Sequence, residues 1–187
     1  MTVESLLRVA RGDAEADLVL RGARIANVCT LEYEEAEVAL YQGYIAGVGK
    51  GYRGKKEEDL SGLLLVPGFL DGHCHIESTM LTPAGFSELA ILRGTTGVAA
   101  DPHEIANATG LAGVRDFWRA SEGLPLHVYF LVSSCVPAAE GLETCQGELG
   151  PSEVAEMLGW DRVLGLAEVM DARAVIDEAP RMSAILD

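Results

Sequence analysis

The sequence is poor in basic residues and has no long apolar run. Its 14 lysines and arginines stand against 29 aspartates and glutamates, which gives a formal net charge of −15. Binding to phosphate groups depends on clustered Lys and Arg, so this balance argues against nucleic acid or an anionic membrane as a partner. No apolar run reaches the roughly 20 residues of a membrane span, and residues 1–17 lack the pattern of a signal peptide. A cytoplasmic location is therefore expected.

The cysteines form no CxxC pair. The four of them, Cys29, Cys74, Cys135 and Cys145, are widely separated, which predicts reduced thiols and neither a zinc knuckle nor a disulfide framework. One class of zinc deaminase combines an H-x-E motif with P-C-x-x-C. The segment His75-Ile76-Glu77 matches the first motif, but the second motif is missing. That class is excluded because the ligand set is incomplete.

Two histidines at alternate positions are the most informative feature that the sequence does contain. A strand-like stretch from Leu63 to Leu70 runs into Asp71-Gly72-His73-Cys74-His75. Residues two apart in a strand point to the same face, so His73 and His75 can bind one metal ion. Cys74 points to the opposite face, and we expect it to pack in the core.

Three further apolar runs also end in polar residues. The runs and the residues after them are 94–100 with Asp101-Pro102-His103-Glu104, 126–132 with Ser133-Ser134-Cys135, and 163–167 with Glu168. An α/β fold carries its chemistry where buried strands open into loops, so these ends are candidate site positions. His127 lies at the opposite end of its strand and is expected to be structural.

Residues 1–62 are expected to form a small β-rich segment. Turn residues such as Gly22, Gly43 and Gly49 separate its short apolar stretches. The predicted elements are a helix over residues 5–11, strands over 16–20, 23–28, 37–40 and 44–48, and an exposed charged connection over 50–59.

Residues 63–187 alternate between strands and helices. Four helices are predicted. The first begins at Thr82-Pro83, the next two cover residues 111–118 and 152–158, and the fourth begins near residues 174–182. Four βα units in series predict a parallel sheet. A closed (β/α)8 barrel needs eight units and about 250 residues. The expected fold class is therefore α/β, with the first half of a (β/α)8 barrel after a small β-rich segment.

These motifs resemble the amidohydrolase superfamily and, within it, the adenine deaminases. Residues 67–75 are similar to the metal-binding signature of the superfamily. The segments similar to the adenine deaminases are 75–83, 94–96, 101–107, 133–138 and 165–171, with residues 5–17 similar to the family's opening. The resemblance implies a TIM-like barrel fused to a β-sandwich built from both chain ends. It also implies a binuclear divalent metal centre that deaminates adenine to hypoxanthine and ammonia.

The resemblance also implies roles for individual residues. His73 and His75 would bind one metal, and Glu168 would be the catalytic carboxylate that bridges two ions. The residues expected in substrate binding or in support of the ligands are His103, Glu104, Glu77, Ser78 and Asp101. Asp101 is expected to cap or orient its loop, with a purely structural role as an equal alternative. Manganese or iron is the expected metal, and zinc suits the same His and carboxylate ligands.

The family takes further ligands and a catalytic aspartate from strands five to eight, which would follow residue 187. We therefore expect the chain alone to be inactive or nearly so, and to require a second polypeptide, a longer gene product or a homo-oligomer.

Two alternatives to an adenine deaminase stay open. One is another cyclic amidohydrolase, of the dihydropyrimidinase or hydantoinase kind, because the metal signature is shared. The other is a non-catalytic assembly module. The segment Asp101–Glu104 favours the deaminase.

Overall fold

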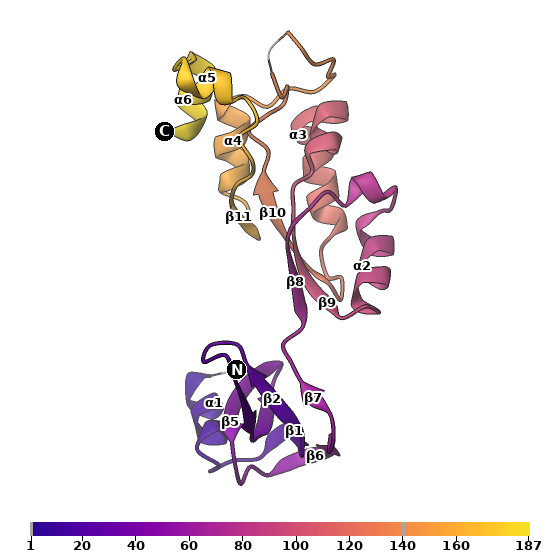
Figure 1. Cartoon of the computed structure of the whole chain (residues 1–187), viewed down its shortest axis with the longest axis vertical. Coiled ribbons are helices and arrows are strands. Elements are labelled where there is room, and N and C mark those ends of the chain that lie inside the picture. Colours follow the sequence, from indigo (N-terminus) through magenta and orange to yellow (C-terminus); the bar gives the residue numbers. More distant parts are fainter. Residues whose placement is uncertain (1, 140) are drawn as a thin grey trace. The chain divides into compact units, whose positions relative to one another are not determined.

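The computed structural model describes residues 2–139 and 141–187 (Figure 1). The chain divides into two compact units, of which unit 1 ends at Pro67 and unit 2 begins at Gly68. Within the described ranges, no helix is both long enough and apolar enough to cross a membrane.

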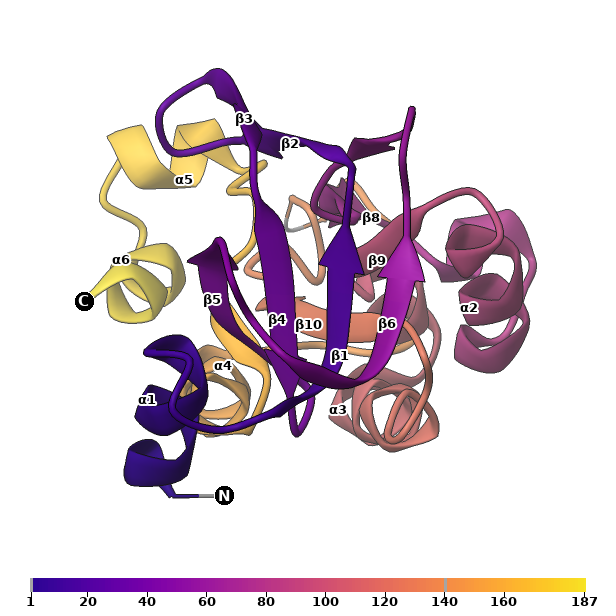
Figure 2. The same cartoon turned by 90° about the horizontal axis from the view of Figure 1, so that it is seen from below.

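Unit 1 combines one helix with two small sheets. Its elements are α1 (Val3–Ala10), β1 (Ala16–Arg21), β2 (Arg24–Asn27), β3 (Glu32–Glu35), β4 (Glu37–Tyr41), β5 (Tyr44–Gly49), β6 (Gly54–Asp59) and β7 (Leu64–Leu65). One sheet has the order β5-β4-β1-β6, which Figure 2 shows from one side, and the other has the order β3-β2-β7. Val9 of α1 packs with Val19 and Ala39 of the larger sheet, and this cluster is the core of unit 1.

Residues 50–59 were predicted as an exposed connection; most of Gly54–Asp59 is exposed as predicted, but the segment is a strand rather than a connection. These residues form β6, which pairs in parallel with β1. Backbone hydrogen bonds hold β6 in the sheet whatever its side chains are, and charged side chains suit an edge strand because they discourage pairing with other molecules. Lys55 Nζ lies 2.7 Å from Asp17 Oδ1 of β1, which adds an ion pair across the two strands.

Unit 2 alternates strands with helices. Its elements are β8 (Phe69–Cys74), η1 (Glu77–Thr79), α2 (Pro83–Ile91), β9 (Thr95–Ala100), α3 (His103–Ala120), β10 (His127–Val132), α4 (Pro151–Leu158), β11 (Val163–Leu166), α5 (Ala172–Ile176) and α6 (Pro180–Leu186). The strands pair in parallel in the order β11-β10-β9-β8. The predicted α/β fold with a parallel sheet is confirmed.

One face of this sheet packs against helices. Val98 and Val128, on neighbouring strands, belong to a buried cluster that includes Phe86 of α2 and Phe117 of α3. The helices lie along this side of the strands in Figure 1. By contrast, Leu70 of β8 is 76% exposed. Part of the apolar surface of the edge strand β8 is therefore open.

Three boundaries predicted for residues 63–187 were wrong. The stretch 63–70 is not one strand, because Pro67 lies in a break between β7 and β8. The segment at His103 is not a loop, since α3 begins there and continues through a non-helical backbone at Gly110. The last predicted helix is two short helices, because Pro180 starts α6 and cannot continue α5.

Candidate metal centre

His73 lies in β8, and His75 directly follows the last residue of that strand. Cys74, between them, packs against the apolar cluster on the helix side, and burial raises the pKa of its thiol. Strand alternation then directs His73 and His75 to the opposite face. Their Nε2 atoms lie 3.2 Å apart. The expected convergence of the two imidazoles is present.

Glu168, which follows β11, reaches the same point from the other edge of the sheet. Its Oε2 lies 3.0 Å from His73 Nε2, and its Oε1 lies 3.9 Å from His75 Nε2. β8 and β11 are separated by β9 and β10, and three strand spacings in a flat sheet amount to about 14 Å. The sheet must therefore curl, as the wall of a barrel does, for these side chains to meet.

Asp101 follows β9 and also turns toward the histidines. It is 1% exposed, and its Oδ2 lies 3.9 Å from His73 Nε2. Its Oδ1 accepts a hydrogen bond from the hydroxyl of Ser133. Burial raises the pKa of the Asp101 carboxyl, although Ser133 and the nearby His75 and His103 act in the opposite direction.

Glu77, Ser78 and Glu104 form a second polar group beside His75. Glu104 Oε2 lies 3.2 Å from His75 Nδ1 but without hydrogen-bond geometry. Ser78 donates to Glu104 Oε1 over 2.9 Å, and the Glu104 backbone N–H donates to Glu77 Oε1 over 3.2 Å. Burial, with Glu104 nearby, raises the pKa of Glu77 to about 7. Burial alone would raise the pKa of Glu104 as well, but its hydrogen bonds lower it.

His103 lies deeper than the other histidines of the group. It is 7% exposed, and its ring centroid is 6.4 Å from that of His75 in an edge-on arrangement. It starts α3, directly after Asp101 and Pro102. The structure thus brings every site residue expected from the sequence into one region of unit 2.

The sequence did not predict the part played by three residues after β10. Ser133 donates to Asp101, and Ser134 donates over 2.9 Å to the backbone carbonyl of Glu168. The Cys135 sulfur lies 3.6 Å from the same carbonyl. These residues connect the Asp101 carboxylate, which follows β9, with the backbone of Glu168, which follows β11. The sequence showed that these residues follow the third strand of the sheet. It did not show which residues they contact.

The donors of this group fit a divalent cation. His73, His75, Asp101 and Glu168 each offer one ligand atom, and these atoms all lie within 4.8 Å of one another. Asp101 Oδ2 is buried and has no hydrogen-bond partner, so a buried acceptor is free to bind an ion. Imidazole nitrogen with carboxylate oxygen is the donor set that zinc, manganese and iron accept. A second, smaller set combines His75, Glu77 and Glu104.

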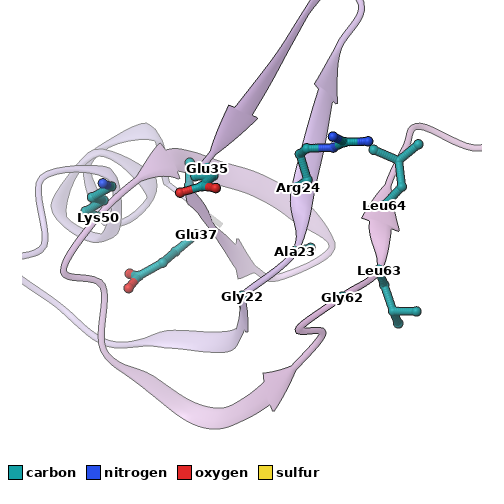
Figure 3. A pocket seen from close by; sticks show the side chains of 10 residues that line it. Gly22, Ala23, Arg24, Glu35, Glu37, Lys50, Gly62, Leu63 and Leu64 are labelled. Atoms are coloured by element: carbon teal, nitrogen blue, oxygen red, sulfur yellow. The ribbon is translucent and has the colours of Figure 1, made fainter.

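Unit 1 contains a cavity of about 610 Å³ with no comparable donor set (Figure 3). Its lining includes Arg24, Glu35, Glu37 and Lys50, with no histidine or cysteine among the residues that form it. Glu37 already accepts hydrogen bonds from Arg21 and from the Tyr52 backbone. The candidate site is therefore the cluster in unit 2.

A protein-family model described as the amidohydrolase family matches residues 64–187. That range contains all of the residues in the cluster. The match therefore covers the strands, the histidine pair and Glu168 together.

The chain is also similar to curated adenine deaminases. It is 44% identical over 180 residues to adenine deaminase 2 of Carboxydothermus hydrogenoformans, which covers 96% of this chain and 31% of that protein. It is 44% identical over 171 residues to adenine deaminase of Archaeoglobus fulgidus, which covers 91% of this chain and 30% of that protein. The chain thus spans about a third of the length of these relatives.

Solved structures of other hydrolases share the fold. The atrazine chlorohydrolase of Arthrobacter aurescens, complexed with zinc, matches 86% of this chain and 51% of its own, with a TM-score of 0.59 and 16% identity. An N-acyl-D-glutamate deacylase of Bordetella bronchiseptica, complexed with zinc and a phosphonate inhibitor, matches 92% of this chain and 42% of its own. Its TM-score is 0.57 at 16% identity. At such low identity the likeness concerns the fold alone.

Proposed function

This chain belongs to the amidohydrolase family, and on that premise we propose that it is part of a metal-dependent adenine deaminase. The observation that carries the proposal is the 44% identity over 96% of the chain to an adenine deaminase. The convergence of His73, His75 and Glu168 supports it, because these side chains come from opposite edges of the sheet and meet within 3.9 Å.

We assign His73 and His75 to cation binding through their Nε2 atoms. Glu168 would join them through Oε2, which lies 3.0 Å from His73 Nε2, and its second oxygen, 3.9 Å from His75 Nε2, would be available to a second ion. Manganese or iron is the proposed metal, and zinc suits the same ligands. A divalent cation bound there supplies Lewis acidity, which activates water near neutral pH.

The proposed reaction replaces the exocyclic amine of adenine with oxygen. A water oxygen bonds to the purine C6 as the bond from C6 to the amine nitrogen breaks. One proton of the water goes to the amine, which leaves as ammonia, and the other ends on a ring nitrogen of the product. Glu77 and Glu104 lie beside His75, where they can hold the ring of the substrate or pass protons from the water to the ring and the leaving amine. His103 is assigned to the wall of the same region. The product is hypoxanthine, so we also assign the protein to purine salvage in the cytoplasm.

The rest of the catalytic machinery is proposed to come from further polypeptide. Leu70 of β8 is 76% exposed and Leu164 of β11 is 61% exposed, and each strand lies at an edge of the sheet. Additional barrel strands would pair with these edges and cover this surface. A longer gene product, a second chain or another copy of this chain could supply them.

Ammonia release from adenine by the full-length gene product, loaded with manganese, tests the proposal. Dihydrouracil and hydantoin serve as competing substrates, because their ring opening is the reaction of the related cyclic amidohydrolases. We expect ammonia from adenine and no ring opening. Ring opening with no adenine turnover would replace the proposed substrate, and no turnover of any of the three by a folded, metal-loaded protein would favour an assembly module.

A further inference from the structure

Asp101 is a buried carboxylate with only half of its acceptor capacity used. Among the residues that the structure describes, Asp101 is the one buried acidic residue, and it is 1% exposed. Ser133 donates to Oδ1, whereas Oδ2 has no hydrogen-bond partner. Burying a carboxylate oxygen without a partner is costly, so such an atom calls for a ligand or a proton.

The unpaired oxygen is directed at the histidine pair. Oδ2 lies 3.9 Å from His73 Nε2. Two atoms that bind one cation can be no further apart than twice the metal–ligand distance, which is about 4.4 Å for nitrogen and oxygen ligands of zinc. The separations of His73 Nε2 from His75 Nε2, 3.2 Å, and from Glu168 Oε2, 3.0 Å, meet the same limit.

We propose that Asp101 binds the cation directly through Oδ2, as a fourth ligand beside His73, His75 and Glu168. Ser133 is then a positioning residue, because its hydrogen bond to Oδ1 leaves Oδ2 free to face the ion. The inference rests on the proposed function, which supplies the metal ion. It adds Asp101 to the residues that bind this ion. The sequence had suggested only a supporting or capping role for Asp101.

The position of Asp101 in the fold agrees with this assignment. β9 lies next to β8 in the sheet, and the Asp101 backbone N–H donates to the Cys74 carbonyl over 2.9 Å. That hydrogen bond fixes Asp101 beside the residue between the two histidines. Ser133 approaches from β10 on the other side, so Asp101 is held from both neighbouring strands.

Cation affinity of the metal-free full-length gene product tests the proposal. Zinc or manganese is titrated in competition with a chromophoric chelator, and cobalt is used to record the ligand-field spectrum. The variant is Asp101→Asn, which keeps the shape of the side chain and removes its charge. The matched control is Asp116→Asn, an exposed aspartate of α3. We expect at least about tenfold weaker binding and an altered cobalt spectrum for Asp101→Asn, and wild-type values for the control.

Unchanged affinity and an unchanged cobalt spectrum in folded Asp101→Asn would overturn the assignment while leaving the proposed function intact. A wild-type protein that binds no cation would overturn both. If Asp101→Asn does not fold, Ser133→Ala takes its place, because it keeps the carboxylate and removes the group that orients it. A severalfold loss of affinity is then expected, and wild-type affinity would contradict the assignment.

Discussion

At the residue scale, the site depends on side chains that sit on rigid elements and aim at one point. His73 belongs to β8, while Asp101 and Glu168 each follow directly on a strand end. Their convergence needs no induced movement, since the closest pairs already lie 3.0–3.9 Å apart. Such preorganisation keeps the entropic cost of binding an ion low, because the ligands are ordered before the ion arrives.

His73→Ala should abolish stabilisation by the cation. A cation present at a hundred times its dissociation constant stabilises the protein that binds it by about 2.7 kcal/mol. Unfolding of the full-length gene product, followed with and without manganese, measures this gain. His127→Ala is the control, because this exposed histidine begins β10 at the end away from the site. A variant lacking His73 that retains the full gain would contradict the ligand assignment.

Ser134→Ala should destabilise the protein by about 0.5–1.5 kcal/mol, because it removes one of two contacts to the partly buried carbonyl of Glu168 and leaves only the Cys135 thiol as donor. Cation affinity should fall as well, since this bond fixes the backbone that carries the carboxylate. Chemical denaturation and the chelator competition measure the two effects. Ser152→Ala, an exposed serine of α4, is the control. Equal stability of the two variants would count against the bracing role of Ser134.

At the element scale, α3 packs closely against the segment before α4. Gly110 interrupts α3 with a φ of 62° and a ψ of −155°, a conformation that side chains disfavour. A Cβ at Gly147 would lie 2.2 Å from the Ala106 carbonyl oxygen and 2.3 Å from the Gly110 nitrogen. The two backbones therefore touch where only glycine fits.

Gly147→Ala should cost about 3 kcal/mol of folding stability, because the clash is with backbone atoms that cannot rotate away. Gly85→Ala in α2 is the matched control. A Cβ there makes ordinary contacts and improves helix propensity by about 0.5–1 kcal/mol. Denaturant midpoints of the two variants should therefore move in opposite directions. A midpoint for Gly147→Ala at or above that of the parent protein would show that the close approach is absent.

Elements with a strong local pattern were predictable from the sequence, and those fixed by partners were not. The alternation around Cys74 indicated the histidine pair, and Thr82-Pro83 marked the start of α2. The charged strand β6 has no apolar pattern that would predict a strand. It is a strand because it pairs with β1. The donation from Ser133 to Asp101 likewise joins residues 32 positions apart, and spacing alone does not reveal such a contact.

At the scale of the whole molecule, the amidohydrolase portion has open sheet edges. β8 and β11 each pair on one side only among the described strands, and Phe69 on β8 is 63% exposed. Unpaired edges with apolar side chains promote association with other chains. The 187 residues span 31% of the length of a related adenine deaminase, so we expect its remaining parts to have counterparts that cover these edges.

The isolated 187-residue chain should therefore self-associate and show little or no adenine deamination. Light scattering after size exclusion measures the first property, and ammonia release measures the second. Mixing with a separately expressed polypeptide that carries the remaining barrel strands should reduce the association and restore turnover. A monomeric, stable chain that deaminates adenine alone would contradict the proposed need for further strands.

The most direct test of the central claim is a manganese titration of the metal-free full-length gene product with adenine as substrate. The account predicts no ammonia release without the cation, turnover that rises with added manganese, and no turnover at any manganese concentration for His73→Ala. Full adenine turnover in the metal-free protein, or an unaltered titration for His73→Ala, would contradict the claim that this cluster is the metal centre of an adenine deaminase.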